Sequence, residues 1–414
     1  MSNRKTICMV TDWYPTKENP YAGSFFKEQA LALSSHFDFL VIHYKEKSKI
    51  PDPLYWLHCC QHTQVHVDKI SQERNIREYT ITTERPLSIG ILCRLYKLIA
   101  KLCRKPYTLP AAYQKHRKKQ LRNGFVNFLD ASFDLLYCVN SQTESSLLRE
   151  IADVAHVPYV VAEHAPFPWP GTVLMPEAKE AIEKADAFLA ISWDKVRQVM
   201  LQDIRPRRID YVGNMVNEEQ FVLGKGSGGP KTFVMVAAHS FYKNYPLFIK
   251  IFNRLTQITD VPFRVMVVGY NANKGYSKNA EELEQKLFAS NFAENLELIP
   301  AISRDQIHTV YGRADAFVMT SIQEGMPVSA LEAGCCGLPI FSTMCGGVED
   351  YVDESIGRIF KIIDSESFAQ ALKDFLEDRL TFDRQHIRQQ IISRFGQKAF
   401  THNMAAIFNA IIDK

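Results

Sequence analysis

The 414-residue sequence lacks any uninterrupted run of roughly 18 apolar residues, the length that a membrane-spanning helix requires. Its first ten residues, MSNRKTICMV, contain neither a sustained apolar segment nor a small-residue cleavage site, so we expect no signal peptide. Internal repeats and low-complexity tracts are also absent. Together these absences favour a cytoplasmic globular protein.

Several motifs of metal and cofactor chemistry are missing as well. The nine cysteines form no Cys-x-x-Cys pair, and most lie in apolar stretches, which favours buried thiols in a reducing compartment. Neither His-Glu-x-x-His nor Asp-x-Asp occurs, so we expect no metal ion and no other cofactor. No Gly-x-Gly-x-x-Gly follows the first predicted strand of either half, which argues against a dehydrogenase.

Acidic residues are missing from one segment of an otherwise balanced chain. The net charge is only +3, so nothing suggests a nucleic-acid partner, yet residues 94–122 contain ten Lys or Arg and no Asp or Glu. The first four basic residues share one face of a predicted helix over Ile91–Arg104, and four others follow Pro110. They are Arg94, Lys97, Lys101 and Arg104, then Lys115, Arg117, Lys118 and Lys119.

Apolar residues occupy another face of that predicted helix, at positions 92, 95, 98, 99 and 102. A solvated helix face is the simpler interpretation of the basic residues. Because no acidic residue offsets them, we expect instead a surface that meets anionic lipid headgroups, which would place the protein on the inner face of the cytoplasmic membrane.

What is present is an alternation of short apolar runs and longer amphipathic stretches, typical of an α/β protein with a parallel sheet covered on both faces. The first half has six predicted strands: Thr6–Thr11, Phe37–His43, Leu135–Val139, Tyr159–Glu163, Ala187–Ile191 and Ile209–Val212. After the glycine-rich loop GKGSGG (224–229) six more follow: Thr232–Ala237, Arg264–Val268, Leu296–Pro300, Ala316–Met319, Pro339–Ser342 and Gly357–Phe360. Helices are predicted between them, including Phe25–Leu33, Trp193–Leu201, Ala280–Ala289 and Ser303–Tyr311.

This pattern predicts two Rossmann-like domains of similar size. We expect an N-terminal domain over residues 1–222, which contains the basic segment 91–122, and a C-terminal domain over 223–390. A helix within 391–414 is expected to pack back toward the N-terminal domain. Open α/β sheets bind ligands at the carboxyl ends of their strands, so a nucleotide or phosphorylated ligand is the first candidate.

One stretch narrows the function. Residues 321–349 read SIQEGMPVSALEAGCCGLPIFSTMCGGVE, in which Glu324 follows a predicted strand and Glu332 lies eight positions later. Pro327 suits the first turn of a helix. The backbone N–H groups near the start of that helix, over Gly325, Met326, Pro327 and Val328, would form an anion site that the helix dipole strengthens.

This stretch resembles the donor-binding signature of the retaining glycosyltransferases of family 4, or group 1. The matching positions are Ser321, Glu324-Gly325, Glu332-Ala333, Gly337-x-Pro339 and Gly346-Gly347-x-Glu349. The resemblance implies the GT-B fold, with two Rossmann-like domains facing across a deep interdomain cleft. It also implies metal-independent, retaining transfer of a hexose from a nucleotide sugar, such as a UDP-sugar, to a glycan or lipid-linked glycan. The resemblance favours a role in the assembly of a bacterial surface polysaccharide, which would be capsule, exopolysaccharide or lipopolysaccharide.

Other segments are similar to the family in the expected order. The stretch WYP…NPYAGSFFKEQALAL places Gly23 and Ser24 at the family's first glycine loop, and VVAEHAP places His164 at a strand end near the donor sugar. In the second half, Lys243 fits the family's diphosphate-binding lysine. The usual arginine is missing, since Ala238 or His239 stands at its position, and His239 is the possible substitute.

From the resemblance we expect His164, Lys243 and Glu324 to be catalytic. Glu332 would accept hydrogen bonds from the nucleotide ribose, and Glu324 would contact the donor sugar. The expected donor-binding set is Gly23, Ser24, His239, Lys243, Glu324, Gly325, Met326, Pro327, Val328 and Glu332. Two alternatives remain open: a nucleotide-sugar epimerase of the same fold, and a nucleotide- or glycan-binding protein without turnover.

Overall fold

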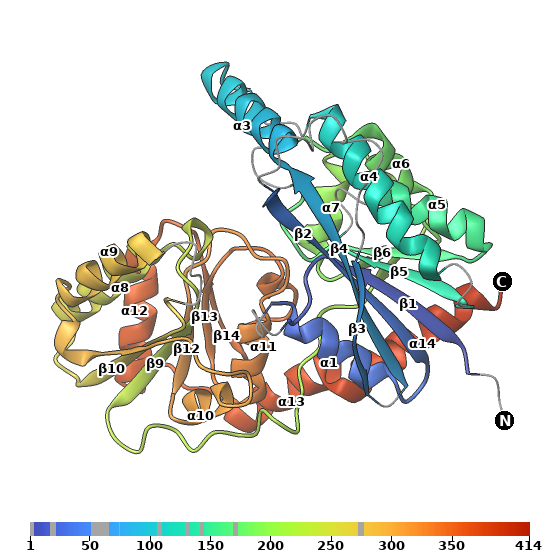
Figure 1. The fold of residues 1–414 in the computed structure, drawn as a ribbon. Helices are drawn as coiled ribbons and strands as arrows, with labels where there is room; N and C mark the ends of the chain where they lie inside the picture. The colour runs from blue at the N-terminus through green and yellow to red at the C-terminus, as the bar shows by residue number, and fades with distance from the viewer. Residues whose placement is uncertain are drawn as a thin grey trace. The chain divides into compact units, whose positions relative to one another are not determined.

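The computed structural model describes residues 4–16, 22–50, 66–73, 75–105, 110–128, 132–140, 145–168, 173–271 and 277–414. The described chain divides into two compact units, each built around its own sheet (Figure 1). The first unit comprises residues 1–191, 195–212 and 401–414, and the second comprises 192–194 and 213–400.

The sheet of the first unit has the strand order β3-β4-β2-β1-β5-β6-β7-β8. All neighbours in it are parallel except β3 and β4, which pair antiparallel at one edge. The strands are β1 (Thr6–Thr11), β2 (Asp38–Ile50), β3 (His66–Glu73), β4 (Ile76–Pro86), β5 (Leu135–Val139), β6 (Tyr159–Ala162), β7 (Ala187–Ala190) and β8 (Ile209–Tyr211).

The sheet of the second unit is parallel throughout, in the order β11-β10-β9-β12-β13-β14. Its strands are β9 (Lys231–Val236), β10 (Phe263–Val268), β11 (Leu296–Ile299), β12 (Ala316–Met319), β13 (Ile340–Thr343) and β14 (Gly357–Phe360). Every residue of β12 and β13 is buried, as a sheet covered on both faces requires.

Helices cover both sheets. In the first unit they are α1 (Ser24–Leu33), α3 (Leu87–Leu102), α4 (Ala111–Phe125), α5 (Ser145–Ala155), α6 (Pro176–Glu183) and α7 (Trp193–Met200), with the 3-10 turn η1 (Val126–Phe128). In the second unit they are α8 (Tyr245–Ile258), α9 (Ser277–Phe288), α10 (Ile307–Gly312), α11 (Val328–Cys335), α12 (Ser365–Leu376) and α13 (Arg384–Phe395), with the 3-10 turns η2 (Phe241–Lys243), η4 (Ala293–Asn295) and η5 (Val348–Asp350).

The last helix, α14 (Gln397–Ile412), starts in the second unit and continues in the first. Its Phe408 ring lies 5.8 Å from the Phe37 ring and 5.6 Å from the Tyr137 ring, both in the first unit. The residues after 400 are therefore part of the core of the first unit.

The sequence predicts the α/β class and two Rossmann-like sheets correctly. All twelve predicted strands are present, four of them with the predicted bounds. The predictions are wrong in two places: β3 and β4 were not expected, and the helix predicted over Ser303–Tyr311 begins only at Ile307. The basic residues of segment 91–122 are carried mainly by two helices, α3 and α4.

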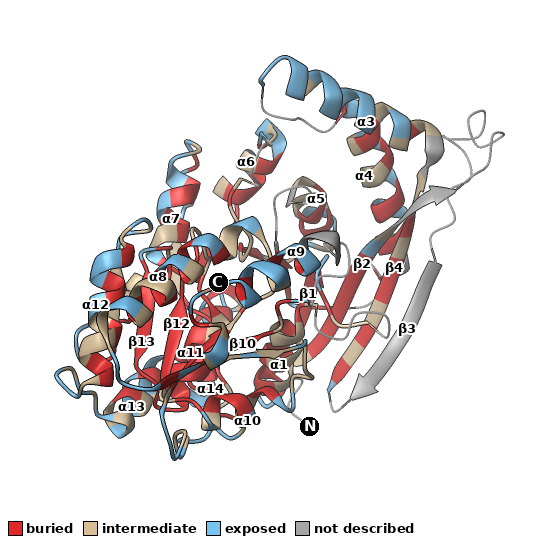
Figure 2. Cartoon of the chain, turned by 90° about the vertical axis from the view of Figure 1, so that its left-hand side faces the viewer, coloured by how far each residue is buried: buried red, intermediate tan, exposed pale blue. Residues whose placement is uncertain are grey.

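Helix α3 differs from the other helices of its unit in burial. Residues 94–99 are exposed on every side, whereas only the start of the helix packs, through Ile89 and Cys93 against Tyr113 of α4 (Figure 2). Within the described ranges, no helix combines the length and the apolar composition needed to cross a bilayer.

Candidate functional site

The predicted donor residues of the second unit gather at the carboxyl edge of its sheet. The chain brings His239 and Lys243 there after β9, Arg304 after β11, Glu324 after β12 and Gly346 after β13. In an open parallel sheet this edge is where ligands bind, because the loops that follow the strands meet there.

Lys243 and Glu324, which are 81 positions apart in the chain, form an ion pair in which Nζ lies 2.6 Å from Oε1. The Glu324 side chain is 15% exposed and the Lys243 side chain is 24% exposed. Lys243 closes the 3-10 turn η2, whose end is fixed by Thr320 Oγ1, which donates to the Lys243 carbonyl at 3.0 Å. A lysine ammonium has about three N–H donors, so this pair leaves Lys243 able to bind a phosphate.

The loop between Glu324 and α11 is held by neighbours in the second unit. Asn214, which is buried, donates from Nδ2 to the Met326 carbonyl at 2.8 Å. Gly347 has φ +75°, and a Cβ there would lie 2.2 Å from the Gly325 carbonyl oxygen. The Gly346-Gly347 pair therefore allows its backbone to lie against the backbone of Glu324 and Gly325. This close approach explains why glycine occupies both positions.

Helix α11 begins at Val328, with Pro327 as its N-terminal cap. Proline has no N–H, so Pro327 cannot donate a hydrogen bond to an anion. Its contribution to an anion site is limited to the restricted backbone conformation that it imposes at the helix start. The backbone donors of this helix start belong to Val328 and Ser329, since the first N–H groups of a helix have no partner within it, whereas Gly325 and Met326 lie in the loop before the cap.

Glu332 is the most deeply buried of the predicted site residues, with 2% of its surface exposed. Arg304 donates from a guanidinium nitrogen to Oε1, and the Tyr311 hydroxyl donates to Oε2 at 2.9 Å. Burial, together with the neighbouring Glu332 carboxylate, raises the pKa of Tyr311 well above its usual value, so this hydroxyl stays a donor. The carboxylate is thus fixed in position by two side chains that we did not predict.

His239 is a poor replacement for a permanently charged arginine. Burial lowers its pKa, and the nearby Lys286 lowers it further, although Glu282 opposes this. The imidazole is therefore favoured in its neutral form, in which it can donate one hydrogen bond but supplies no fixed charge. Its Nδ1 is buried and has no hydrogen-bond partner in the described structure.

Two further residues of the 321–349 stretch also carry buried polar atoms with no partner among the described residues, namely Ser321 Oγ and Glu349 Oε2. Burial is the main reason that the pKa of Glu349 is raised, and the Asp194 carboxylate adds to it, while the Gly346 N–H opposes the shift. Native proteins rarely leave such groups without a partner, so this edge of the sheet has the polar character of a binding site.

In the first unit the structure brings Gly23, Ser24 and His164 together. His164 follows β6, and its ring lies 4.7 Å from the Phe26 ring and 5.5 Å from the Phe25 ring at the start of α1. Gly23 has φ +58°, and a Cβ there would lie 2.2 Å from the Trp13 carbonyl oxygen, so this position requires glycine.

The turn that carries His164 rests on a buried lysine that the sequence did not single out. Lys195 is fully buried and donates from Nζ to the Ala165 carbonyl at 2.5 Å and to Gln198 Oε1 at 3.0 Å. Glu163 Oε1 accepts from the Ala165 N–H at 2.9 Å. These contacts fix the backbone at Ala165, the residue that follows His164.

No metal-binding group of three or more His, Cys, Asp or Glu side chains occurs among the residues that the structure describes. The groups that the structure places at the sheet edge of the second unit are Lys243, the start of α11 and two glutamates. Of the groups found here, sequence reasoning missed Arg304, Tyr311 and Lys195, because nothing in the spacing marks an isolated arginine, tyrosine or lysine as a partner of a distant glutamate or turn.

Residues 217–394 match the family described as Glycosyl transferases group 1. Over 209 residues the chain is 23% identical to D-inositol 3-phosphate glycosyltransferase of Mycobacteroides abscessus, covering 48% of this chain and 46% of that protein. It is 22% identical over 248 residues to the putative colanic acid biosynthesis glycosyltransferase WcaL of Salmonella typhimurium, covering 57% and 59% respectively. In each case the match spans less than two thirds of the relative.

Among solved structures, Anabaena Alr3699/HepE in complex with UDP superimposes with a TM-score of 0.69 at 15% identity, covering 98% of this chain and 100% of that one. The lipopolysaccharide outer core galactosyltransferase WaaB superimposes with a TM-score of 0.65 at 15% identity, covering 99% of each chain. At these identities the likeness shows the fold alone, and that fold is GT-B. The comparisons thus show a chain of GT-B fold in which residues 217–394 match the family Glycosyl transferases group 1.

Proposed function

We propose that the chain is a retaining, metal-independent glycosyltransferase of family 4 that moves a hexose from a nucleotide diphosphate sugar to a glycan or lipid-linked glycan. The observation that carries the proposal is the match of residues 217–394 to group 1, at whose sheet edge Lys243, Glu324 and Glu332 lie. WcaL is named for colanic acid biosynthesis, and an Escherichia coli relative for galactosyl transfer to a diphosphoundecaprenol-linked sugar. These names support a role in assembling a bacterial surface polysaccharide.

The proposed chemistry depends on stabilising the diphosphate that leaves. The bond between the sugar C1 and the phosphate oxygen breaks, the acceptor oxygen bonds to C1 on the same face, and the acceptor proton passes to the leaving phosphate. Lys243 and the N–H groups at the start of α11 stabilise the charge that develops on that phosphate. Glu332 accepts hydrogen bonds from the ribose, and Glu324 contacts the sugar. We further propose His164 as a catalytic residue and Gly23 and Ser24 as donor-binding residues.

Nucleotide binding is the first test. UDP, GDP and ADP, followed by their sugar derivatives, are compared by thermal shift, with UDP first because HepE has been solved with UDP. In titrations with the nucleotide that binds, Glu332→Ala should weaken binding by about 1.5–3 kcal/mol, the range for a hydrogen bond to a charged group. Glu324→Gln should spare free nucleotide but lower transfer from the nucleotide sugar. Unchanged nucleotide affinity in a folded Glu332→Ala variant would remove the ribose role.

A protein that binds nucleotide or glycan without turnover is the second candidate. It is favoured by Ala238 and His239 at the expected arginine position, because the lowered pKa of His239 leaves that position without a fixed charge. Sugar transfer and donor hydrolysis separate the two candidates. Nucleotide-sugar binding by the wild type with neither reaction, across a panel of lipid-linked and free glycans, would favour the binding protein.

We also propose that the first unit contacts an anionic membrane. On α3 and directly after it, Arg94, Lys97, Lys101 and Arg104 are exposed, and on α4 Lys115 and Lys119 are exposed. The structure reduces the predicted set, because Lys118 pairs with Glu150 and the Arg117 guanidinium lies over the Tyr44 ring at 5.7 Å. The exposed cations of α3 and the residue Arg104 after it, together with Lys115, would contact lipid phosphates.

The same helix exposes apolar side chains beside its basic face. Those of Ile91, Leu95, Tyr96, Leu98, Ile99 and Leu102 are between 46% and 74% exposed. Basic and apolar stripes side by side on one helix are typical of a helix that lies in the membrane interface. This supports a peripheral location on the inner face of the cytoplasmic membrane, close to lipid-linked acceptors.

A further inference from the structure

Glu332, on which the proposed nucleotide site depends, is engaged at both oxygens. Arg304 donates to Oε1 and Tyr311 donates to Oε2. A carboxylate with 2% exposure is costly to keep charged unless a cation and hydrogen-bond donors compensate for the lost water. Tyr311 supplies a neutral donor, and Arg304 supplies a positive charge.

Arg304 is held in place from several directions. It lies in the turn between β11 and α10, where Gln220 Nε2 donates to its carbonyl at 2.6 Å. Its guanidinium carbon lies 5.6 Å from the centre of the Phe221 ring, which is fully buried. The Arg304 side chain is 27% exposed, so it sits at the border between the buried carboxylate and solvent.

Arg304 and Tyr311 each contact a different oxygen of Glu332, and a carboxylate oxygen can accept more than one hydrogen bond. Hydrogen bonds from the adjacent hydroxyls of a ribose require that this carboxylate is charged and correctly turned. The Arg304 guanidinium favours the charged form and restricts the orientation of the carboxylate.

We infer that Arg304 is a positioning residue for the ribose, which acts through Glu332 and fixes the orientation and charge of that carboxylate. This inference rests on the proposed nucleotide-sugar site and deepens it. Two other roles make different predictions: a purely structural tie between the β11–α10 turn and α11, and a direct contact of the guanidinium with the base or phosphates.

The test compares UDP, GDP and ADP, each with its 2′,3′-dideoxy analogue, by calorimetric titration of the full chain. For a nucleotide that binds, the wild type should prefer the ribose form at least about tenfold, since the lost hydroxyls bond a charged acceptor. Arg304→Gln should reduce this preference to less than about threefold. Arg313→Gln is the matched control, because Arg313 pairs with Glu297 on the exposed surface of the same unit at 2.7 Å.

The outcomes separate the inference from the proposal beneath it. Failure of the wild type to bind any nucleotide overturns both. Equal wild-type affinity for ribose and dideoxy forms overturns the ribose role of Glu332, and the inference with it. If Arg304→Gln weakens both forms equally and keeps the preference, Arg304 contacts another part of the nucleotide. If it lowers only the melting temperature, Arg304 is a structural tie. Either result overturns the inference while the donor site stands.

A double-mutant cycle keeps the test decisive if Arg304→Gln does not fold. Arg304→Lys retains a cation but loses the planar guanidinium, so in the wild-type background it should lower the ribose preference. In the Glu332→Ala background Arg304→Lys should not change the affinity for either nucleotide form any further, because the carboxylate through which Arg304 acts is absent. An additional loss of affinity in that background, or an unchanged preference in the wild-type background, overturns the inference.

Discussion

Lys195 and Glu332 are both nearly inaccessible to solvent, and each lies beneath one of the candidate sites. Lys195 holds the backbone beside His164, and Glu332 is held by Arg304 and Tyr311. Removing one partner of such a group leaves a buried charge without compensation, which is far more costly than breaking a pair on the surface. The geometry of both sites therefore depends on residues that would contact no substrate.

His43 provides a prediction about pH at the scale of one residue. It is 4% exposed in β2, and burial lowers its pKa from 6.5 to about 4, with the backbone of Asp12 opposing and Lys45 reinforcing the shift. Between these two values the unfolded chain binds more protons than the folded chain, so the free energy of unfolding falls as pH drops.

Between pH 7 and pH 5 the contribution of His43 should amount to about 2 kcal/mol. Urea unfolding of the wild type and of His43→Phe at both pH values checks this, because the variant lacks the titrating group. The gap between their free energies of unfolding should shift by that amount in favour of the variant at pH 5. A gap that stays constant with pH would show that His43 does not titrate as described.

How far the sequence predicts the site depends on whether a residue acts locally or through a distant partner. Glu324 and Glu332 are recognisable because they sit at fixed spacing around a strand, a turn and a helix start. The pairing of Lys243 with Glu324 cannot be recognised from the sequence, because the two residues are separated by 81 positions. They meet only when β9 and β12 become neighbours in the sheet. The same holds for Arg304 and Glu332, which are 28 positions apart.

Among the elements, the strands of the second unit were the easiest to predict and β4 was among the hardest. Runs such as AFVM in β12 are buried on both faces and read as continuous apolar segments. In β4 a core-facing position is occupied by Glu78, which is 2% exposed and accepts a hydrogen bond from the Tyr14 hydroxyl at 2.5 Å. A charged residue at a core position hides the alternation that identifies a strand.

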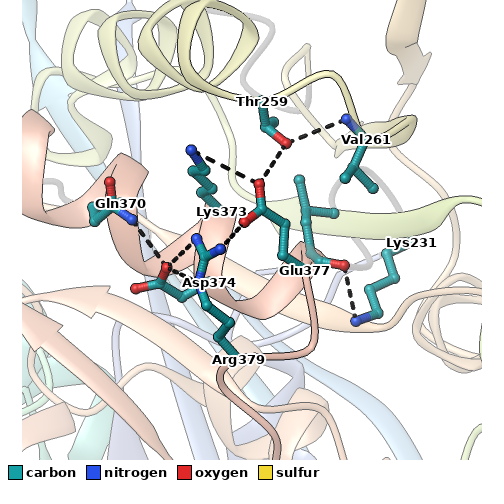
Figure 3. A network of polar contacts seen from close by, with 9 residues as sticks. Lys231, Thr259, Val261, Gln370, Lys373, Asp374, Glu377 and Arg379 are labelled. Atoms are coloured by element: carbon teal, nitrogen blue, oxygen red, sulfur yellow. Dashed lines mark hydrogen bonds and ion pairs between the residues drawn. The ribbon is translucent and has the colours of Figure 1, made fainter.

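The C-terminal end of α12 gives a prediction at the scale of one helix. Lys231, from the start of β9, donates to the Phe375 carbonyl at 2.6 Å and pairs with Asp378 at 2.5 Å. Near the same helix end Arg379 pairs with Asp374 at 2.7 Å (Figure 3). A cation at this end satisfies helix carbonyls that have no partner within the helix and complements the helix dipole.

Lys231→Met should therefore lower the free energy of unfolding by about 1–2 kcal/mol, since it removes a charged donor while keeping an apolar stem over the Phe375 ring. Lys225→Met, at an exposed lysine of the same unit, is the matched control and should change the value by less than about 0.5 kcal/mol. Chemical unfolding of both variants measures the difference. Equal stability of the two would mean that Lys231 adds nothing to the end of α12.

At the scale of the whole molecule, the charge is distributed unevenly between the units. The excess of ten basic residues over residues 94–122 lies entirely in the first unit, on α3 and α4, whereas the nucleotide-binding groups that we propose lie mainly in the second. Part of the basic excess is neutralised, because Lys118 and Arg122 both pair with Glu150 of α5. The part on α3 is not accompanied by any acidic residue, and it borders the exposed apolar stripe of the same helix.

Charge and apolar surface on α3 predict different responses to salt. Attraction of exposed cations to anionic lipid is screened within roughly 10 Å at 0.1 M salt, whereas insertion of apolar side chains is not. Co-sedimentation with vesicles of phosphatidylcholine, with and without phosphatidylglycerol, should show binding only to the anionic vesicles at low salt. At about 0.5 M salt this binding should weaken but persist for the wild type.

Two double variants separate these contributions. Ile99→Gln/Leu102→Gln should bind at low salt and be released at high salt, because it keeps the cations and loses part of the apolar stripe, where Leu102 is 74% exposed. Lys97→Gln/Lys101→Gln should bind less at low salt, since each basic residue near an anionic surface contributes about 1 kcal/mol. Wild-type binding that does not depend on phosphatidylglycerol would contradict the anionic surface. Equal salt sensitivity of the Ile99→Gln/Leu102→Gln variant and the wild type would leave the apolar stripe without a part in binding, so the membrane contact would rest on charge alone.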